Sequence, residues 1–106
     1  MKVAISSTGD NLDAPLDPRF GRCAYLIFAD PDTGELTAIA NAAAAESGGA
    51  GVKVATTVAE NGAQVAISGS FGPKAARVLT AGDVETYTTS ATTVRSALEE
   101  WRQLSE

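Results

Sequence analysis

The stretch from Gln64 to Leu79 constrains the fold of this chain most strongly, because it combines a buried strand pattern, a glycine break and a helix start. Residues 65 to 67 form the short apolar run that is typical of a strand buried on both faces. Gly69 and Gly72 interrupt this run, and Pro73 suits the first turn of a helix, where an N–H would have no intrahelical partner. The pattern predicts a tight strand-to-helix loop.

A loop of this kind directs backbone N–H groups, and the positive end of a helix dipole, beyond the carboxyl end of its strand. An anion would be stabilised there. The residues of this loop that are candidates for binding it are Gly69, Ser70, Phe71, Gly72 and Lys74. The same Gly-Ser-Phe-Gly-Pro sequence is also simply a well-made turn, and turn chemistry alone favours that interpretation.

Length and charge restrict the class of protein. With 106 residues the chain can bury one hydrophobic core, so residues 1–106 are expected to form a single domain. A net charge of −5 with scattered basic residues argues against binding to nucleic acid or to an anionic membrane, which needs clustered Lys and Arg. No apolar stretch approaches the length of a membrane span and no signal-peptide pattern follows Met1, so we expect a cytoplasmic protein.

Hydrophobic patterning predicts three strands followed by a helix, a strand, a helix, a strand and a last helix. The expected strands are 2–6, 22–29, 35–39, 65–67 and 84–88, and the expected helices are 52–61, one that begins at Pro73, and 94–104. Thr92 or Thr93 is the expected N-cap of the last helix, without the Glu or Gln of a capping box. Two long irregular stretches remain, 7–21 and 41–51, and the second is expected to be the least ordered part of the chain.

These connections predict a three-layer α/β fold around a five-stranded mixed sheet. The first three strands form a meander whose second strand is antiparallel to the first, while helical crossovers make the later strands parallel to one another. With the fourth strand beside the first, the strand order is three, two, one, four, five. The long connections then share the edge at which the parallel strands end, where open α/β sheets bind ligands.

Several short motifs, taken in order, resemble a known family. They are Met1 to Ser6, Asp17 to Cys23, Gly48 to Gly51, Ile67 to Ala75, and Thr93-Val94 at the start of the last helix. Their order and spacing are similar to those of the dinitrogenase iron–molybdenum cofactor biosynthesis family, the small NifX-like proteins, over essentially the whole chain. The resemblance implies a ribonuclease-H-like sheet and a non-catalytic protein that binds and carries iron–sulfur or iron–molybdenum cofactor precursors between cofactor donor and acceptor proteins. Some relatives carry a His just before Phe-Gly-Arg, where this sequence has Arg19.

The residues themselves argue against two other kinds of chemistry. The first and fourth expected strands carry no acid, so a metal-dependent nuclease would lack its carboxylates. Cys23 is the only cysteine and histidine is absent, which excludes an internal disulfide, a His-based zinc site and a catalytic triad. A permanent iron–sulfur protein normally needs several thiolates.

A carrier that must release its cargo needs fewer thiolate ligands than a permanent iron–sulfur protein. One labile thiolate as metal ligand, backbone N–H groups from the 69–74 turn and nearby cations would hold an anionic cluster loosely. The candidate cofactor-binding residues are Arg19, Phe20, Gly21, Arg22, Cys23, Gly69, Ser70, Phe71, Gly72 and Lys74, with Cys23 as the metal ligand.

Several of these residues have a structural alternative. Cys23 is either a ligand or a small packing residue at the start of a strand. Arg22 either faces the cargo or pairs with Asp17 or Asp13. Phe20 and Phe71 either form the wall of a cleft or pack into the core beneath their loops.

A second class of function also stays open at this stage. A small regulatory or interaction domain would bind a phosphate-bearing metabolite or a partner protein at the same loops. The sequence leaves the oligomeric state open, with a monomer favoured.

Overall fold

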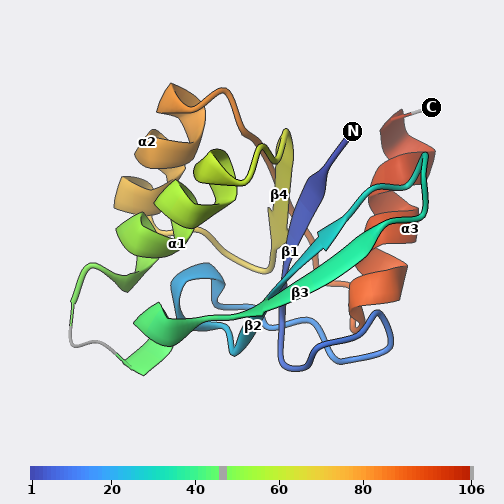
Figure 1. Cartoon of the computed structure of the whole chain (residues 1–106), viewed down its shortest axis with the longest axis horizontal. Coiled ribbons are helices and arrows are strands. Elements are labelled where there is room, and N and C mark those ends of the chain that lie inside the picture. Colours follow the sequence, from blue (N-terminus) through green and yellow to red (C-terminus); the bar gives the residue numbers. More distant parts are fainter. Residues whose placement is uncertain (46–47, 106) are drawn as a thin grey trace.

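The computed structural model describes residues 1–45 and 48–105 (Figure 1). In chain order the elements are β1 (Val3–Ser7), the 3-10 helix η1 (Phe20–Arg22), β2 (Tyr25–Ala29), β3 (Leu36–Ala40), the 3-10 helix η2 (Ala42–Ala45), α1 (Ala50–Glu60), β4 (Val65–Ser68), α2 (Pro73–Ala81), β5 (Glu85–Thr88) and α3 (Val94–Ser105).

The five strands form one mixed sheet in the order β3-β2-β1-β4-β5. β2 is antiparallel to both of its neighbours, and β4 is parallel to β1 and β5. Helices α1 and α2 cover one face of this sheet and α3 covers the other (Figure 1). The predicted three-layer α/β architecture and strand order are therefore confirmed, and both are consistent with a ribonuclease-H-like arrangement.

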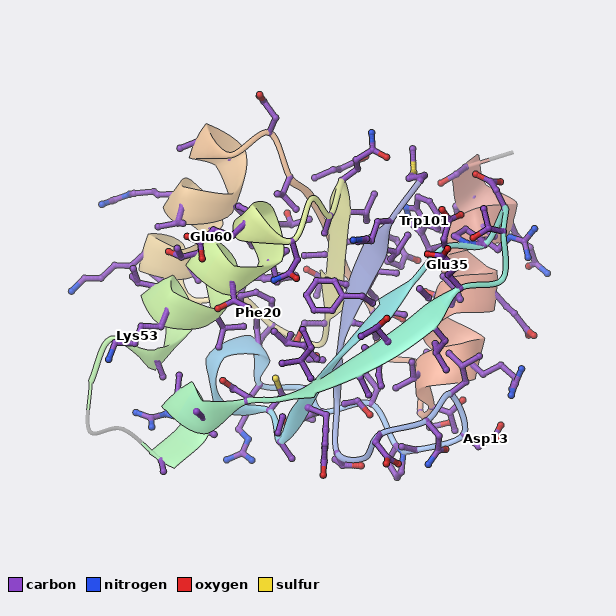
Figure 2. The ribbon with its side chains drawn as sticks, viewed as in Figure 1. Asp13, Phe20, Glu35, Lys53, Glu60 and Trp101 are labelled. Carbon is purple, nitrogen blue, oxygen red and sulfur yellow. The ribbon has the colours of Figure 1, made fainter. Side chains whose placement is uncertain are left out.

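The two central strands supply both cores of the molecule, because successive side chains of a strand point to opposite faces of the sheet. Ala4 and Ala66 face α1 and α2. Ile5 and Ile67 face α3, where Trp101 packs against the sheet (Figure 2). All residues of β1 and β4 are buried, as the apolar pattern of residues 65 to 67 predicts for a strand covered on both sides.

Helix α3 begins where the patterning predicts, with Thr93 as its N-cap. The Thr93 Oγ1 accepts the backbone N–H of Ser96 at 3.1 Å, and the backbone N–H of Thr93 donates to the Ser96 Oγ at 3.1 Å. Ser96 therefore takes the place that Glu or Gln has in a capping box, and this exchange was not predicted from the sequence.

The start of β2 differs from the expectation. The strand begins at Tyr25 and not at residue 22, because residues 20–22 coil into η1. The backbone N–H of Arg22 closes this coil on the carbonyl of Arg19 at 3.2 Å.

The start of α1 also differs from the expectation, since the helix begins at Ala50 and not at residue 52. Gly51 therefore lies within its first turn, and Gly49 is the N-cap in the left-handed region, with φ of 70°. Part of the irregular stretch before it forms η2, and residues 46 and 47 lie outside the described residues. The expected low order of 41–51 stays a prediction.

The compact turns and the long loops lie at opposite edges of the sheet. Gly34, Gly62 and Asp83 turn the chain tightly with φ of 80°, 77° and 60°. The opposite edge, at the bottom of Figure 1, gathers the long loop after β1 near the carboxyl ends of β1 and β4. None of the described helices is long and apolar enough to cross a membrane.

Candidate anion-binding cleft

An open cleft of about 480 Å³ lies beyond the carboxyl end of β4. Three segments form it: Arg19 with η1, the first turn of α1, and the β4–α2 loop with the first turn of α2. The lining residues are Arg19, Phe20, Gly21, Arg22, Gly49, Ala50, Gly51, Val52, Ser70, Gly72, Pro73, Lys74 and Ala75. The cleft therefore lies at the sheet edge that the topology predicts for a ligand.

Three cationic side chains and two helix N-termini line this cleft, beside apolar side chains such as Phe20 and Val52. The first N–H groups of a helix have no intrahelical acceptor and form the positive end of its dipole. Both α1 and α2 present their first turns to the cleft, and Arg19, Arg22 and Lys74 add three cationic side chains. No Asp or Glu occurs among the described lining residues, although the whole chain has a net charge of −5. This combination suits an anion.

The β4–α2 loop is held against the segment that precedes η1. A Cβ on Gly69 would lie 2.7 Å from the Cα of Pro18, so only glycine permits this approach. The Ser70 Oγ donates to the Pro18 carbonyl at 2.8 Å, and Arg19 and Ser70 form an isolated parallel bridge. Gly72 has no such constraint, because its φ is −67° and a Cβ there would meet no atom within 4 Å.

Arg19 is held by a buried carboxylate. Asp17 is 4% exposed, and its Oδ1 accepts the backbone N–H of Arg19 at 3.0 Å and the Arg19 Nε at 3.4 Å. A pairing of Arg22 with Asp17 or Asp13 stayed open from the sequence, but both of these acids pair with other arginines. Asp13 pairs with Arg95 at 2.9 Å, and the Arg22 Nη1 donates to the backbone carbonyl of residue 44 at 3.0 Å.

Cys23 lies behind the cleft and does not line it. Its side chain is fully buried, in the same core as Phe20 and Val54. Burial, assisted by the negative charge of Asp17, raises the pKa of the Cys23 thiol from 9.0 to about 11, so the thiol is protonated at neutral pH. Among the described residues, no three side chains of the metal-ligating types lie together. The geometry favours the packing alternative for Cys23.

The Cys23 position is further fixed by Asn41. The Asn41 Nδ2 donates to the Cys23 carbonyl at 2.8 Å and to the Gly21 carbonyl at 3.3 Å, and lies 3.7 Å from the Cys23 Sγ. This amide therefore ties the end of β3 to both ends of the turn that carries Arg22.

Phe20 and Phe71 form an aromatic pair with ring centroids 4.9 Å apart and planes inclined by 45°. Phe20 is 2% exposed and lies between α1 and the central strands (Figure 2). It also lines the cleft, so Phe20 both forms part of the cleft wall and packs into the core beneath its loop. Phe71 packs against the same core and does not line the cleft.

The structure thus brings most of the predicted site residues together. Seven of them line the cleft: Arg19, Phe20, Gly21, Arg22, Ser70, Gly72 and Lys74. The other three, Cys23, Gly69 and Phe71, are not among its lining residues. The first turn of α1, residues 49–52, also belongs to the site and was not predicted from the sequence. The available signal was the glycine-rich motif from 48 to 51, which precedes a helical pattern at the predicted ligand edge.

The fold and the cleft define a mixed α/β protein with a cationic site at the carboxyl ends of its central strands. The family described as dinitrogenase iron-molybdenum cofactor matches residues 1–104, and the chain belongs to this family. The resemblance seen in the sequence motifs is confirmed.

Solved structures with the same fold are also similar to this chain in sequence. The orange protein from Desulfovibrio gigas, solved in its apo form, is 34% identical with a TM-score of 0.91, and the match covers 96% of this chain and 87% of that one. A putative NifB protein from Thermotoga is 29% identical with a TM-score of 0.84, again over 96% of this chain and 87% of that one. A search of curated proteins finds no match.

Proposed function

We propose that this protein binds an anionic iron–sulfur or iron–molybdenum cofactor precursor in the cleft and carries it without catalysing a reaction. One observation carries the proposal: two helix N-termini and three cationic side chains surround a single open cleft, with no carboxylate among its described lining residues. Membership of the iron–molybdenum cofactor family supports a metal cluster as the class of cargo.

In this proposal charge and hydrogen bonds hold the cargo, and no bond to a resident thiolate is needed. The outer sulfides of a metal–sulfide cluster accept hydrogen bonds from N–H groups, as they do in iron–sulfur proteins. The guanidinium groups of Arg19 and Arg22, the ammonium of Lys74 and the helix N–H groups supply such donors. Because no covalent bond must break, an acceptor protein with thiolate ligands can withdraw the cargo. The proposed partners are cofactor donor and acceptor proteins in the cytoplasm.

Anaerobic reconstitution tests this proposal. The purified protein is incubated with ferrous iron, sulfide and molybdate and then desalted, and its visible spectrum and metal content are measured. Charge-transfer absorption should stay with the protein. The double variant Arg19→Gln/Lys74→Gln should retain much less metal. The matched double variant Arg95→Gln/Lys2→Gln also removes one arginine and one lysine charge, but at positions outside the cleft lining. It should retain as much metal as the parent protein. A colourless, metal-free parent protein would reject the carrier function.

A second candidate is a regulatory domain that binds a phosphate-bearing metabolite. The helix N-termini of α1 and α2 favour it, because backbone N–H groups at such positions also bind phosphate. A phosphate ligand would leave the protein colourless and raise its melting temperature with ligand concentration. Thermal stabilisation by inorganic pyrophosphate, together with failure of the reconstitution, would favour this second function.

A further inference from the structure

Asp17 is the one charged side chain among the described residues that is buried, and it lies directly behind a cation of the cleft. Its backbone is fixed to the ends of both central strands. The Asp17 N–H donates to the Ser6 carbonyl at 3.1 Å, and the Asp17 carbonyl accepts the Ser6 Oγ at 2.6 Å and the Ser68 Oγ at 3.5 Å. Ser6 and Ser68 are fully buried and share a hydrogen bond of 2.8 Å. The carboxylate therefore has a fixed position.

The contact between the Asp17 carboxylate and the Arg19 side chain is the weaker of the two bonds that Oδ1 accepts. The backbone N–H of Arg19 lies at 3.0 Å, but the Nε lies at 3.4 Å, beyond the usual length of a charge-assisted hydrogen bond. The Asp17 side chain is 6% exposed, whereas the Arg19 side chain is 67% exposed. One partner of this ion pair is thus anchored, and the other is free to turn further into the cleft.

An anion in the cleft and the Asp17 carboxylate attract the same guanidinium. When Arg19 turns towards the anion, Asp17 keeps its bond from the backbone N–H but loses its nearest cation, which is unfavourable for a buried charge. We propose that Asp17 is a built-in competitor for the Arg19 guanidinium and sets how readily the cleft releases its anionic cargo. This inference rests on the proposed carrier function, and it names the residue that regulates release at that same site.

The test uses tetrathiomolybdate, a coloured dianion with a molybdenum–sulfur core. Asp17→Asn keeps Oδ1 as an acceptor for the Arg19 N–H and removes only the charge. The dissociation constant, measured by ultrafiltration, and the release rate, measured after dilution over an anion-exchange resin, should both fall about three- to tenfold. Asp13→Asn is the matched control, because it removes a carboxylate from another Asp–Arg pair. Asp13 lies beside α3, apart from Phe20 in Figure 2, so this variant should leave both values unchanged.

A double-mutant cycle distinguishes competition for the Arg19 guanidinium from direct electrostatic repulsion between the Asp17 carboxylate and the anion. In an Arg19→Gln background, Asp17→Asn should change the affinity by less than about twofold, because the contested guanidinium is gone. An equal tightening with and without Arg19 would overturn the inference, and so would weaker binding by Asp17→Asn, which would make the carboxylate a positioning group for Arg19.

A measurement on the parent protein covers the case in which Asp17→Asn does not fold. The nitrogen-15 resonance of the Arg19 Nε should shift when tetrathiomolybdate is added, and an unchanged resonance at saturation would overturn the inference. Failure of the parent protein to bind either tetrathiomolybdate or the reconstituted cluster counts against the proposed function itself. Binding by the parent with no effect of Asp17→Asn counts against the competitor role of Asp17 alone.

Discussion

The backbones of Gly21 and Gly51 are in direct contact, since a Cβ on Gly21 would lie 2.7 Å from both the Cα and the N of Gly51. This contact joins η1 to the first turn of α1 and so fixes two walls of the cleft against each other. Neither glycine has a positive φ. The requirement for glycine at position 21 therefore comes from the close approach and not from the backbone conformation.

Gly21→Ala should destabilise the protein by about 1–3 kcal/mol, because the new methyl group must push η1 away from α1. The free energy of unfolding in urea measures the effect. Gly72→Ala is the matched control, because φ is −67° there and a Cβ would meet no atom within 4 Å. It should be neutral or stabilising by up to about 1 kcal/mol, through the entropy of the unfolded chain. Equal stability of Gly21→Ala and the parent would contradict the close contact.

Local signals made the sheet and its layers predictable from the sequence. The apolar run at 65–67 is short, contains the β-branched Val65 and Ile67, and is followed by glycine, which favours a strand covered on both faces. Pro73 and Thr93 mark helix starts by their own chemistry. Once each element was located, short connections and the handedness of crossovers left little choice of topology.

The cleft was less predictable, because its walls depend on contacts between distant segments. The N-cap of α1 is Gly49, which forms no side-chain hydrogen bond, so no polar capping side chain in the sequence indicates that the helix begins at Ala50. The burial of Cys23 follows from the packing of η1 under α1, which no local pattern encodes. Gly21 and Gly51 likewise show their role only when the two backbones meet.

Cys23 should behave as a core residue towards thiol reagents. In the folded protein at mildly alkaline pH its alkylation by iodoacetamide should be much slower than in urea, because the thiol is fully buried and its pKa is raised to about 11. Cys23→Ala should still retain cluster after anaerobic reconstitution. Rapid alkylation of the folded protein, or loss of the cluster in this variant, would restore the thiolate as a ligand.

The same buried thiol predicts a loss of stability at alkaline pH. Its pKa is higher in the folded chain than in the unfolded one, so the stability it contributes is complete below pH 9.0 and is lost as pH rises towards about 11. The parent should lose about 2–3 kcal/mol over this interval relative to Cys23→Ala, which has no thiol to ionise. Urea unfolding curves of both proteins across this pH range give the difference. Parallel curves would show that the thiol ionises without penalty.

Glu100 on α3 accepts hydrogen bonds from Tyr87 and Thr89 and so joins the helix to the end of β5. The Tyr87 hydroxyl is the larger cause that lowers the pKa of Glu100 below 4.5, with a smaller contribution from Thr89. The stability from this carboxylate is therefore present above pH 4.5 and is lost as pH falls through the lowered pKa. Glu100→Gln should reduce the dependence of the melting temperature on pH in the acid range. An unchanged dependence in Glu100→Gln would contradict this contribution of the carboxylate.

Lys74 tests whether charge in the cleft holds the cargo. It lies in the first turn of α2, where its ammonium adds to the positive end of the helix dipole and faces the same space as Arg19. Lys74→Gln should weaken the binding of tetrathiomolybdate at low ionic strength by about three- to tenfold, and the difference should shrink at high salt as ions screen the attraction.

Lys2→Gln is the matched control for this experiment. The Lys2 Nζ donates to the carbonyl of Asn61 at 2.8 Å, beside the compact turns at the opposite edge of the sheet. This variant has the same net charge as Lys74→Gln, so a general effect of charge on the affinity would appear in both proteins. A loss confined to Lys74→Gln would locate the attraction in the cleft. An equal loss in both variants would show that tetrathiomolybdate responds to the charge of the whole molecule, and would contradict a specific anion site.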